Sequence, residues 1–337
     1  MRKPTLSIDL GSSNTNIYQI GSGAGVVLSE PSVVALSENE GRKVKAVGLD
    51  AKRMIGKTVD GTVVVSPVFE ARIEDERAAT AMLDNFLNKV TIKRLGMRPD
   101  VLFSVPCGAE NSAIKKYEQV LNDCGVYNVH FVESPVLTAV GMGVPLTESN
   151  PCFLIDIGGG TTTIATVSLG GVISGFSVNM GGKSIDKMII SHVENEFGLK
   201  IGALTAEKIK IQIGSLADKD ETATVVDGRD LQTGKPRAIS VNARDLYPVI
   251  SLFFDKVFQL AGMLMAKLPA EMCADVRKSG VYFAGGTSRI LGLDEYFNDK
   301  MGMHANIAEE PELAAAIGGG IVAGDTKLLA RLRLNRK

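Results

Sequence analysis

The chain has 337 residues, of which 45% are apolar and 22% are charged, and its formal net charge is −1. These values are typical of a globular protein that is long enough to bury two substantial hydrophobic cores. They exclude a strongly basic chain that binds nucleic acid through bulk charge, so a polyanion would have to be bound at a local site.

The cysteines and the first residues narrow the class further. Cys107, Cys124, Cys152 and Cys273 show no CxxC or CxxxH spacing, and we expect reduced core residues in a cytoplasmic protein. The N-terminus leads directly into a strand, so we expect no signal peptide. No apolar run approaches the roughly 20 residues of a membrane span, and any membrane contact is therefore expected to be peripheral.

The first predicted element is a β-hairpin at residues 5–20, TLSIDLGSSNTNIYQI. Two apolar runs flank a turn that follows Asp9 and contains Gly11 and small polar residues. Backbone N–H groups of such a turn can approach a polyanion, hydroxyl groups add donors, and the aspartate can hold a cation or its water shell. The pattern predicts a phosphate-binding hairpin.

The rest of the first half alternates strands and helices. Residues 24–65 form short alternating runs with a helix at 48–55, which indicates a small α/β insertion. The later elements are an amphipathic helix at 74–90, a buried strand at 101–108, a helix at 110–124, and a strand followed by a helix in NVHFVESPVLTAVGMG.

The hairpin pattern recurs at residues 152–171, CFLIDIGGGTTTIATVSLGG. It aligns with the first hairpin without a gap, which pairs Asp9 with Asp156 and Gly11 with Gly158. A single glycine-rich hairpin can be purely structural, but the duplicated spacing favours two related halves with a nucleotide between them. The two aspartates would then hold a divalent cation through water.

The second half is predicted to repeat the organisation of the first. A turn at Gly285 and Gly286 is expected to open a helix whose free N–H groups face an anion or a ribose. The elements are helices across 182–198 and 205–215, an insertion of short strands at 216–245, a core helix at 245–268, a strand, glycine turn and helix at 279–297, and a final glycine-opened helix at 314–324.

Several motifs in this order carry a family resemblance. The two DxG hairpins, the VESP junction between them, an AGG turn near Gly285 and the glycine-rich closing helix resemble the superfamily of actin, Hsp70 and sugar kinases. Within it, the stretches LSEPSVVAL, VGLDAKRMIGKT, TAEKIKIQIGS and DLQTGKPR are similar to the MreB-type bacterial actins, and the similarity runs from end to end.

The resemblance implies an α/β, actin-like ATPase fold with two domains, each with a ribonuclease H-like core and a small inserted subdomain. The first domain would comprise residues 1–142 and 318–337, with its small subdomain at about 33–65. The second would comprise residues 143–317, with its small subdomain at about 181–250. The resemblance also implies ATP and Mg²⁺ in the cleft and homopolymeric filaments on the inner face of the cytoplasmic membrane. There they would act with wall-synthesis membrane proteins to direct rod shape.

The resemblance also gives roles to single residues. Asp9 and Asp156 would order the metal and its waters. Glu207 and Lys210 would approach the ribose and base, although without the resemblance an exposed helix pair is the preferred interpretation. The other nucleotide-binding candidates are Gly11, Ser12, Ser13, Asn14, Thr15, Gly158, Gly159, Gly160, Thr161 and Thr162 for the phosphates, and Gly285, Gly286 and Thr287 for the adenosine and α-phosphate.

The chain departs from the family at the group that orients the attacking water. Members commonly have an acidic residue before the proline of the strand–helix junction, and here that position is Ser134. Glu133 lies one residue earlier, and from this neighbouring backbone position we expect its side chain to point elsewhere. A serine hydroxyl can hold water but is a weak base, and losing a water-orienting group costs about 10²- to 10⁴-fold in rate. We therefore expect slow hydrolysis. Two further positions depart from the family. Thr163 stands where the family usually has glutamate, and Thr287 stands where it often has a third glycine. The candidate catalytic residues are Ser134, Glu133, Asp156 and Thr161.

Residues 91–100, TIKRLGMRPD, are a candidate membrane contact. Ile92, Leu95 and Met97 alternate with cationic residues, which suits an anionic bilayer surface, and the corresponding loop of MreB-type proteins enters the membrane. A solvated connection with incidental apolar residues is the alternative.

Two other function classes share the hairpins. A small-molecule kinase would need an additional carboxylate base that faces an acceptor hydroxyl, and no segment obviously supplies one. An Hsp70-like chaperone would need a peptide-binding domain after the second half.

Overall fold

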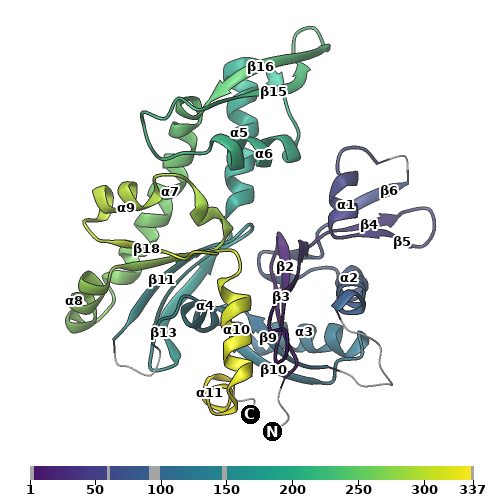
Figure 1. Ribbon diagram of the computed structural model, residues 1–337. Helices are drawn as coiled ribbons and strands as arrows, with labels where there is room; N and C mark the ends of the chain where they lie inside the picture. Colours follow the sequence, from purple (N-terminus) through teal and green to yellow (C-terminus); the bar gives the residue numbers. More distant parts are fainter. Residues whose placement is uncertain (1–3, 59–60, 91–98, 146–149, 335–337) are drawn as a thin grey trace.

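The computed structural model describes residues 4–58, 61–90, 99–145 and 150–334 (Figure 1). It contains two five-stranded sheets, with strand orders β10-β9-β1-β2-β3 and β13-β12-β11-β17-β18. In each sheet three antiparallel strands are followed by two parallel ones. The two halves of the chain therefore repeat one α/β arrangement. The strands are β1 (Leu6–Leu10), β2 (Asn14–Gln19), β3 (Gly25–Pro31), β9 (Asp100–Val105) and β10 (Asn128–Glu133) in the first sheet, and β11 (Cys152–Ile157), β12 (Thr162–Ser168), β13 (Gly171–Val178), β17 (Val281–Ala284) and β18 (Ala305–Ile307) in the second.

The two predicted hairpins have the same register. Ile8 pairs with Ile17 in the first, and Ile155 pairs with Ile164 in the second. Their turns close with equivalent backbone hydrogen bonds, from Gly11 N–H to the Asn14 carbonyl (3.0 Å) and from Gly158 N–H to the Thr161 carbonyl (2.9 Å). The gapless alignment of the two stretches is thereby confirmed.

Helices cover the first sheet, and a small sheet extends from it. The predicted amphipathic helix at 74–90 is α2, whose residues Met82 and Phe86 are fully buried with Phe103 of β9. This apolar face packs α2 into the core of the first half. The elements are α2 (Glu76–Val90), α3 (Asn111–Asp123) and α4 (Ser134–Gly141), the small sheet β5-β4-β6 of β4 (Val34–Ser37), β5 (Val44–Val47) and β6 (Thr62–Val65) with α1 (Leu49–Met54), and the short hairpin of β7 (Val68–Phe69) and β8 (Arg72–Ile73).

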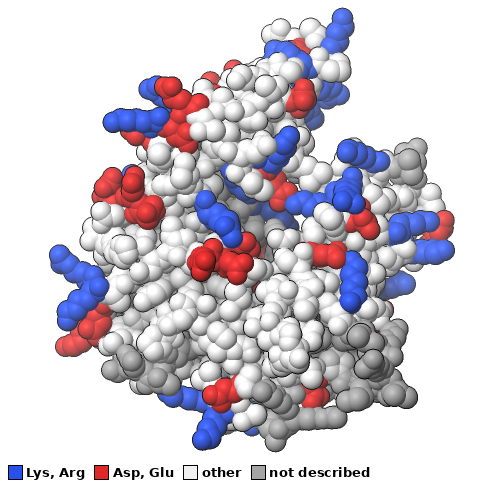
Figure 2. Space-filling view, in the orientation of Figure 1, with Lys and Arg blue, Asp and Glu red and all other residues white. Residues whose placement is uncertain are grey.

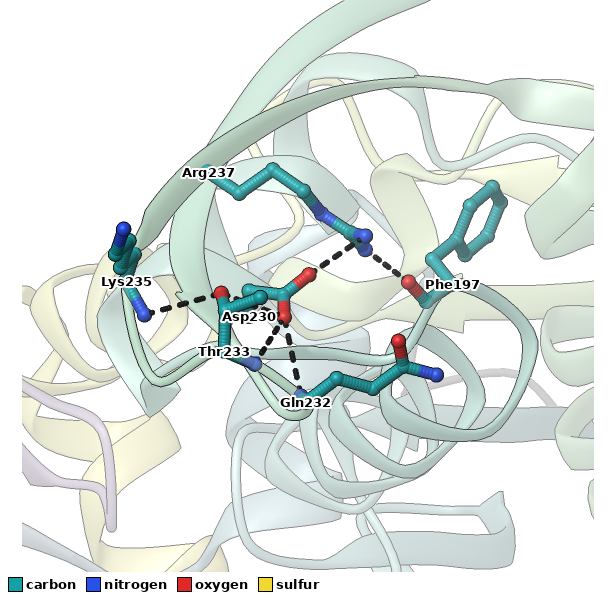
Figure 3. A network of polar contacts seen from close by, with 6 residues as sticks. All are labelled: Phe197, Asp230, Gln232, Thr233, Lys235 and Arg237. Atoms are coloured by element: carbon teal, nitrogen blue, oxygen red, sulfur yellow. Dashed lines mark hydrogen bonds and ion pairs between the residues drawn. The ribbon is translucent and has the colours of Figure 1, made fainter.

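The second half carries its own small sheet, β14-β15-β16. Asp230, at the end of β15, fixes the turn to β16, because its carboxylate accepts hydrogen bonds from the N–H groups of Gln232 (3.0 Å) and Thr233 (2.7 Å) (Figure 3). Arg237 pairs with Asp230 (2.8 Å) and also donates to the carbonyl of Phe197, the last residue of α5. The hairpin is therefore tied to the end of a core helix. The elements are α5 (Gly182–Phe197), β14 (Leu199–Lys200), α6 (Ala203–Ile213), β15 (Ala223–Asp230), β16 (Pro236–Asn242), α7 (Ala243–Met265), α8 (Ala270–Ser279) and α9 (Leu293–Met301).

The structure differs from the sequence prediction after the turn at Gly285. The expected helix is only a short 3₁₀ turn, Gly286–Arg289, and α9 begins later, at Leu293. The intervening backbone pairs elsewhere, since the Leu291 carbonyl accepts the N–H of Leu216 at 2.8 Å. Backbone that is committed to a distant bridge cannot continue a helix.

Helix α7 is the predicted core helix. Its length and its mean hydropathy of 1.4 over an 18-residue window are enough for a helix to cross a membrane. It lies instead in the core of the second half, where Phe254, Val257 and Ala261 are fully buried. The apolar character of α7 is thus explained by packing.

Helices α4 and α10 (Ala314–Gly324) cross where the two halves meet. Helix α10, followed by α11 (Thr326–Leu332), lies between the two sheets in Figure 1 and packs on α4. The sequence predicted a glycine-opened final helix, but the glycines lie inside α10 and α11 follows it. A Cβ on Gly318 would be 1.8 Å from the Leu137 carbonyl oxygen, and one on Gly141 would be 1.9 Å from that of Ala314. The two backbones therefore touch. The domain boundaries stay a prediction. Helix α10 spans the boundary that was predicted between residues 317 and 318.

Gly141→Ala should destabilise the protein by about 1–3 kcal/mol or more, which is the usual cost of overpacking. The new methyl group meets backbone that cannot rotate away. The measurement is the free energy of urea unfolding. Gly324→Ala, in the last turn of α10 with nothing within 4 Å of the new Cβ, is the matched control and should be neutral or stabilising by up to about 1 kcal/mol. Equal losses in both variants would contradict the crossing.

Candidate nucleotide site

A cavity of about 610 Å³ lies between the two halves, within the range of about 300–1,000 Å³ that is common for small-molecule sites. Figure 2 shows basic and acidic side chains gathered together around the hollow between the two upper lobes. Most residues predicted from the sequence line this cavity. They are Asp9, Gly11, Ser12, Ser13, Asn14, Ser134, Asp156, Gly158, Gly159, Gly160, Thr161, Glu207, Lys210, Gly285, Gly286 and Thr287.

Three predicted residues are not among those that line the cavity. Thr15 and Thr162 are fully buried, and their hydroxyl groups pair within their own halves, with Ser32 (2.9 Å) and with the Met180 carbonyl (2.8 Å). Successive side chains of a strand point to opposite faces, which turns both threonines away from the cavity. The carboxylate of Glu133 accepts the N–H of Gly108 at 2.8 Å, which holds it outside the site. The roles predicted for these three side chains are corrected accordingly.

The predicted membrane contact cannot be placed. Ile92, Leu95 and Met97 lie outside the described residues.

The tips of the two hairpins meet at the cavity. A Cβ on Gly159 would be 1.9 Å from the Ser13 hydroxyl oxygen, and one on Gly160 would be 2.9 Å from that of Ser12. Only glycine allows this approach. Hydroxyl groups from one half and bare backbone from the other therefore converge on one position, as a polyphosphate site requires.

Asp9 and Asp156 lie beneath the hairpin tips as an acidic pair, and neither forms an ion pair within the described residues. Desolvation raises the pKa of Asp9, against hydrogen bonds from Ser104 and Asn16. Desolvation and then the charge of Asp9 raise the pKa of Asp156 to about 7, and Thr138 of α4 donates to its carboxylate at 3.3 Å. Two desolvated carboxylates that repel each other fit a divalent cation with its water shell. Among the described residues no group of three or more His, Cys, Asp or Glu offers a fuller metal site, so water would supply the other ligands.

Two ion pairs include residues that line the cavity. Lys210 pairs with Asp186 (2.7 Å) and donates to the Gly182 carbonyl (3.0 Å). Glu207, on the same helix α6, pairs at 2.7 Å with Lys52 of α1 and so joins the two halves of the chain. The hydroxyl of Thr287 donates to the Gly158 carbonyl at 3.1 Å, which ties the Gly285 turn to the second hairpin.

Sequence reasoning missed several residues of this site. Thr138, which contacts Asp156, lies one turn after Ser134 on the same helix. Asp186 and Lys183 follow the glycine pair at 181–182, and the adjacency of two glycines and a lysine at a helix start was the available signal.

The chain matches the family described as MreB/Mbl protein over residues 3–331. It belongs to the MreB/Mbl family. It is 33% identical over 331 residues to the cell shape-determining protein Mbl of Bacillus subtilis, covering 98% of each chain. It is 35% identical over 321 residues to the cell shape-determining protein MreB of Escherichia coli, covering 94% of this chain and 92% of that one. The crystal structure of MreB5 of Spiroplasma citri bound to AMPPNP matches with a TM-score of 0.90 at 29% identity, covering 96% of each chain.

The predicted family and actin-like fold are thereby confirmed, and the protein is a bacterial actin homologue. Within this MreB/Mbl-family chain, the departures at Ser134 and Thr163 both line the cavity. Ser134 is the first residue of α4. The hydroxyl of Thr163 lies 2.8 Å from that of Ser177, so it is held within the second sheet. Neither side chain supplies a carboxylate to the site.

The acidic pair predicts a pH dependence of stability. The folded protein keeps the Asp156 proton up to a pKa of about 7, whereas the unfolded chain releases it near the ordinary aspartate pKa of 3.8. Stability should therefore fall as pH rises from about 4 to 7, by at most about 1.4 kcal/mol per pH unit for this group. Thermal unfolding without nucleotide or divalent cation should show this fall.

Asp156→Asn should flatten the profile, whereas Asp227→Asn, at an exposed position of β15, should leave it unchanged. Mg²⁺ should raise the melting temperature of the wild type more at pH 8 than at pH 5. A wild-type profile identical to that of Asp156→Asn would refute the assignment.

Proposed function

We propose that this bacterial actin homologue binds ATP with Mg²⁺ between its two halves and polymerises into filaments that direct cell shape and wall synthesis. The observation that carries the proposal is the meeting of the two hairpin tips above the paired carboxylates Asp9 and Asp156. The AMPPNP-bound state of the MreB5 relative supports it.

The residues of the cavity divide the work of holding a nucleotide. The turns at 11–14 and 158–161 would donate to the phosphates, and Asp9 and Asp156 would hold Mg²⁺ through water. A bound Mg²⁺ would neutralise phosphate charge. Glu207 and Lys210, which line the cavity, would approach the ribose and base, and Gly285 to Thr287 would close over the adenosine.

The same cavity supports slow hydrolysis. Ser134 lies at the cavity without a carboxylate, and Glu133 is fastened to Gly108 N–H. A hydroxyl can position water but withdraws its proton poorly at neutral pH. The chain is therefore better equipped to hold ATP than to cleave it.

The proposed cellular role is the one that the MreB/Mbl family implies. The names of the Mbl and MreB relatives support a role in cell shape. Binding to the inner face of the cytoplasmic membrane through Ile92, Leu95 and Met97, and contact with wall-synthesis membrane proteins, rest on the sequence pattern and the resemblance. Co-sedimentation with anionic liposomes tests the membrane contact. The alternative of a small-molecule kinase has no support among these relatives.

The purified protein should pellet in the ultracentrifuge when ATP and Mg²⁺ are added. Gly159→Val should abolish this, because its side chain would displace Ser13 from the hairpin contact. Gly171→Val, whose Cβ has nothing within 4 Å, is the matched control and should pellet as the wild type does. Pelleting that ignores nucleotide would contradict the proposal, and soluble protein that forms ADP only with an acceptor would favour a kinase.

Ser134→Glu should raise the rate of phosphate release from ATP, by up to about 10²-fold, because it places a carboxylate where the attacking water is expected. The assay is phosphate release under saturating ATP. Ser112→Glu, the same exchange at an exposed residue of α3, should leave the rate unchanged. An unchanged rate in Ser134→Glu would count against the assigned role of this position.

A further inference from the structure

Lys183 is bonded to both phosphate hairpins. It is the second residue of α5, and its backbone N–H donates to the carbonyl of Gly159 at 2.8 Å. Its ammonium group crosses to the other half of the protein and donates to the carbonyl of Ser12 at 2.6 Å. The side chain thus lies where the two hairpin tips converge, and it lines the cavity.

The charge of Lys183 is not balanced by a carboxylate at contact distance. Asp186 is paired with Lys210 and Glu207 is paired with Lys52, each at 2.7 Å. In the part of the chain that the structure describes, Lys183 forms no ion pair of its own, and its hydrogen bond goes to a neutral carbonyl. Desolvation lowers its pKa; the charges of Glu207 and Asp186 raise it, and those of Lys52 and Lys187 lower it. A partly buried cation in this setting is stabilised by an anion that enters the cavity.

The two carboxylates beneath the hairpin tips are of the wrong sign for a polyphosphate. Asp9 and Asp156 repel phosphate oxygens unless a cation stands between them. A fixed ammonium group beside Ser12 and Gly159 offsets this repulsion from within the chain and does so at the hairpin tips. It would act on the β- and γ-phosphates, because these are the groups that the hairpin tips would hold.

We propose that Lys183 is a ligand of the terminal phosphates, which makes nucleotide binding by this chain selective for polyphosphates and less dependent on a divalent cation. The inference rests on the proposed nucleotide function and adds a ligand to that same site. Lys183 contributes charge-assisted hydrogen bonds to phosphate oxygens, which are stronger than those to neutral acceptors.

The test compares affinities for ATP, ADP and AMP, by competition against a fluorescent ATP analogue, with Mg²⁺ and with EDTA. Lys183→Met should weaken ATP and ADP about 10- to 100-fold and AMP less than about threefold, because only the first two reach the hairpin tips. The loss should be larger in EDTA, where no divalent cation offsets the charges of Asp9 and Asp156. Lys183→Arg should retain most of the affinity.

Lys187→Met is the matched control. Lys187 is exposed one turn further along α5, so its removal deletes the same charge from the same helix without touching the cavity, and all three affinities should stay within about threefold. Lys183→Gln is the second test variant, because its amide can still donate to the Ser12 carbonyl while the charge is gone. It should reproduce the selective loss, and circular dichroism verifies that it is folded.

The outcomes separate this inference from the proposed function. Wild-type affinity for ATP in both Lys183→Met and Lys183→Gln, or an equal loss for ATP, ADP and AMP, overturns the role of Lys183 and leaves ATP binding intact. A wild-type protein that binds none of the three nucleotides overturns both.

Discussion

The close crossing of α4 and α10 is the contact on which the site depends. At Gly141 and Gly318 the two helices pack backbone against backbone, and the surrounding core draws on both sheets, with Leu102 from the first and Leu154 from the second. Helix α4 starts in the cavity at Ser134, contacts Asp156 through Thr138 and ends at the crossing. The packing that joins the halves therefore also sets the position of groups that face the phosphates.

The charged groups of the cavity fit the binding of a polyphosphate better than its hydrolysis. Asp9 and Asp156 are desolvated and repel each other, so they are held at a free-energy cost that a cation relieves. Lys183 supplies a positive charge at the hairpin tips. In the proposed complex these groups would act on the ground state of a bound polyphosphate. The activation of water is a different task, and Ser134 contributes only a hydroxyl group to it.

Much of this arrangement could be predicted from local pattern, and the rest could not. The duplicated Asp-x-Gly spacing predicted two hairpins in equivalent register, because turn chemistry and strand alternation are local properties. Strand alternation could also have excluded Thr15 and Thr162 from the phosphate site. The bond between Lys183 and the Ser12 carbonyl could not be predicted, because it joins residues 171 positions apart and depends on how two separate halves pack. The 3₁₀ turn after Gly285 was missed for the same reason, since a distant bridge at Leu291 competes with the helix.

The contacts across the mouth of the cleft are of a weaker kind than the crossing beneath it. Lys52 and Glu207 join α1 to α6, and Asn179 donates to Glu70 of the β7–β8 turn. Both carboxylates of these contacts are partly exposed, and an exposed ion pair such as Lys52–Glu207 contributes about 0–1 kcal/mol. Glu207 is also the residue proposed to approach the ribose and base, so one carboxylate would serve both closure and nucleotide contact. The mouth of the cleft is therefore held weakly and its base firmly. A ligand that contacts both hairpins would bridge the two halves, and it would contribute more to the stability of their closed arrangement than the contacts at the mouth do.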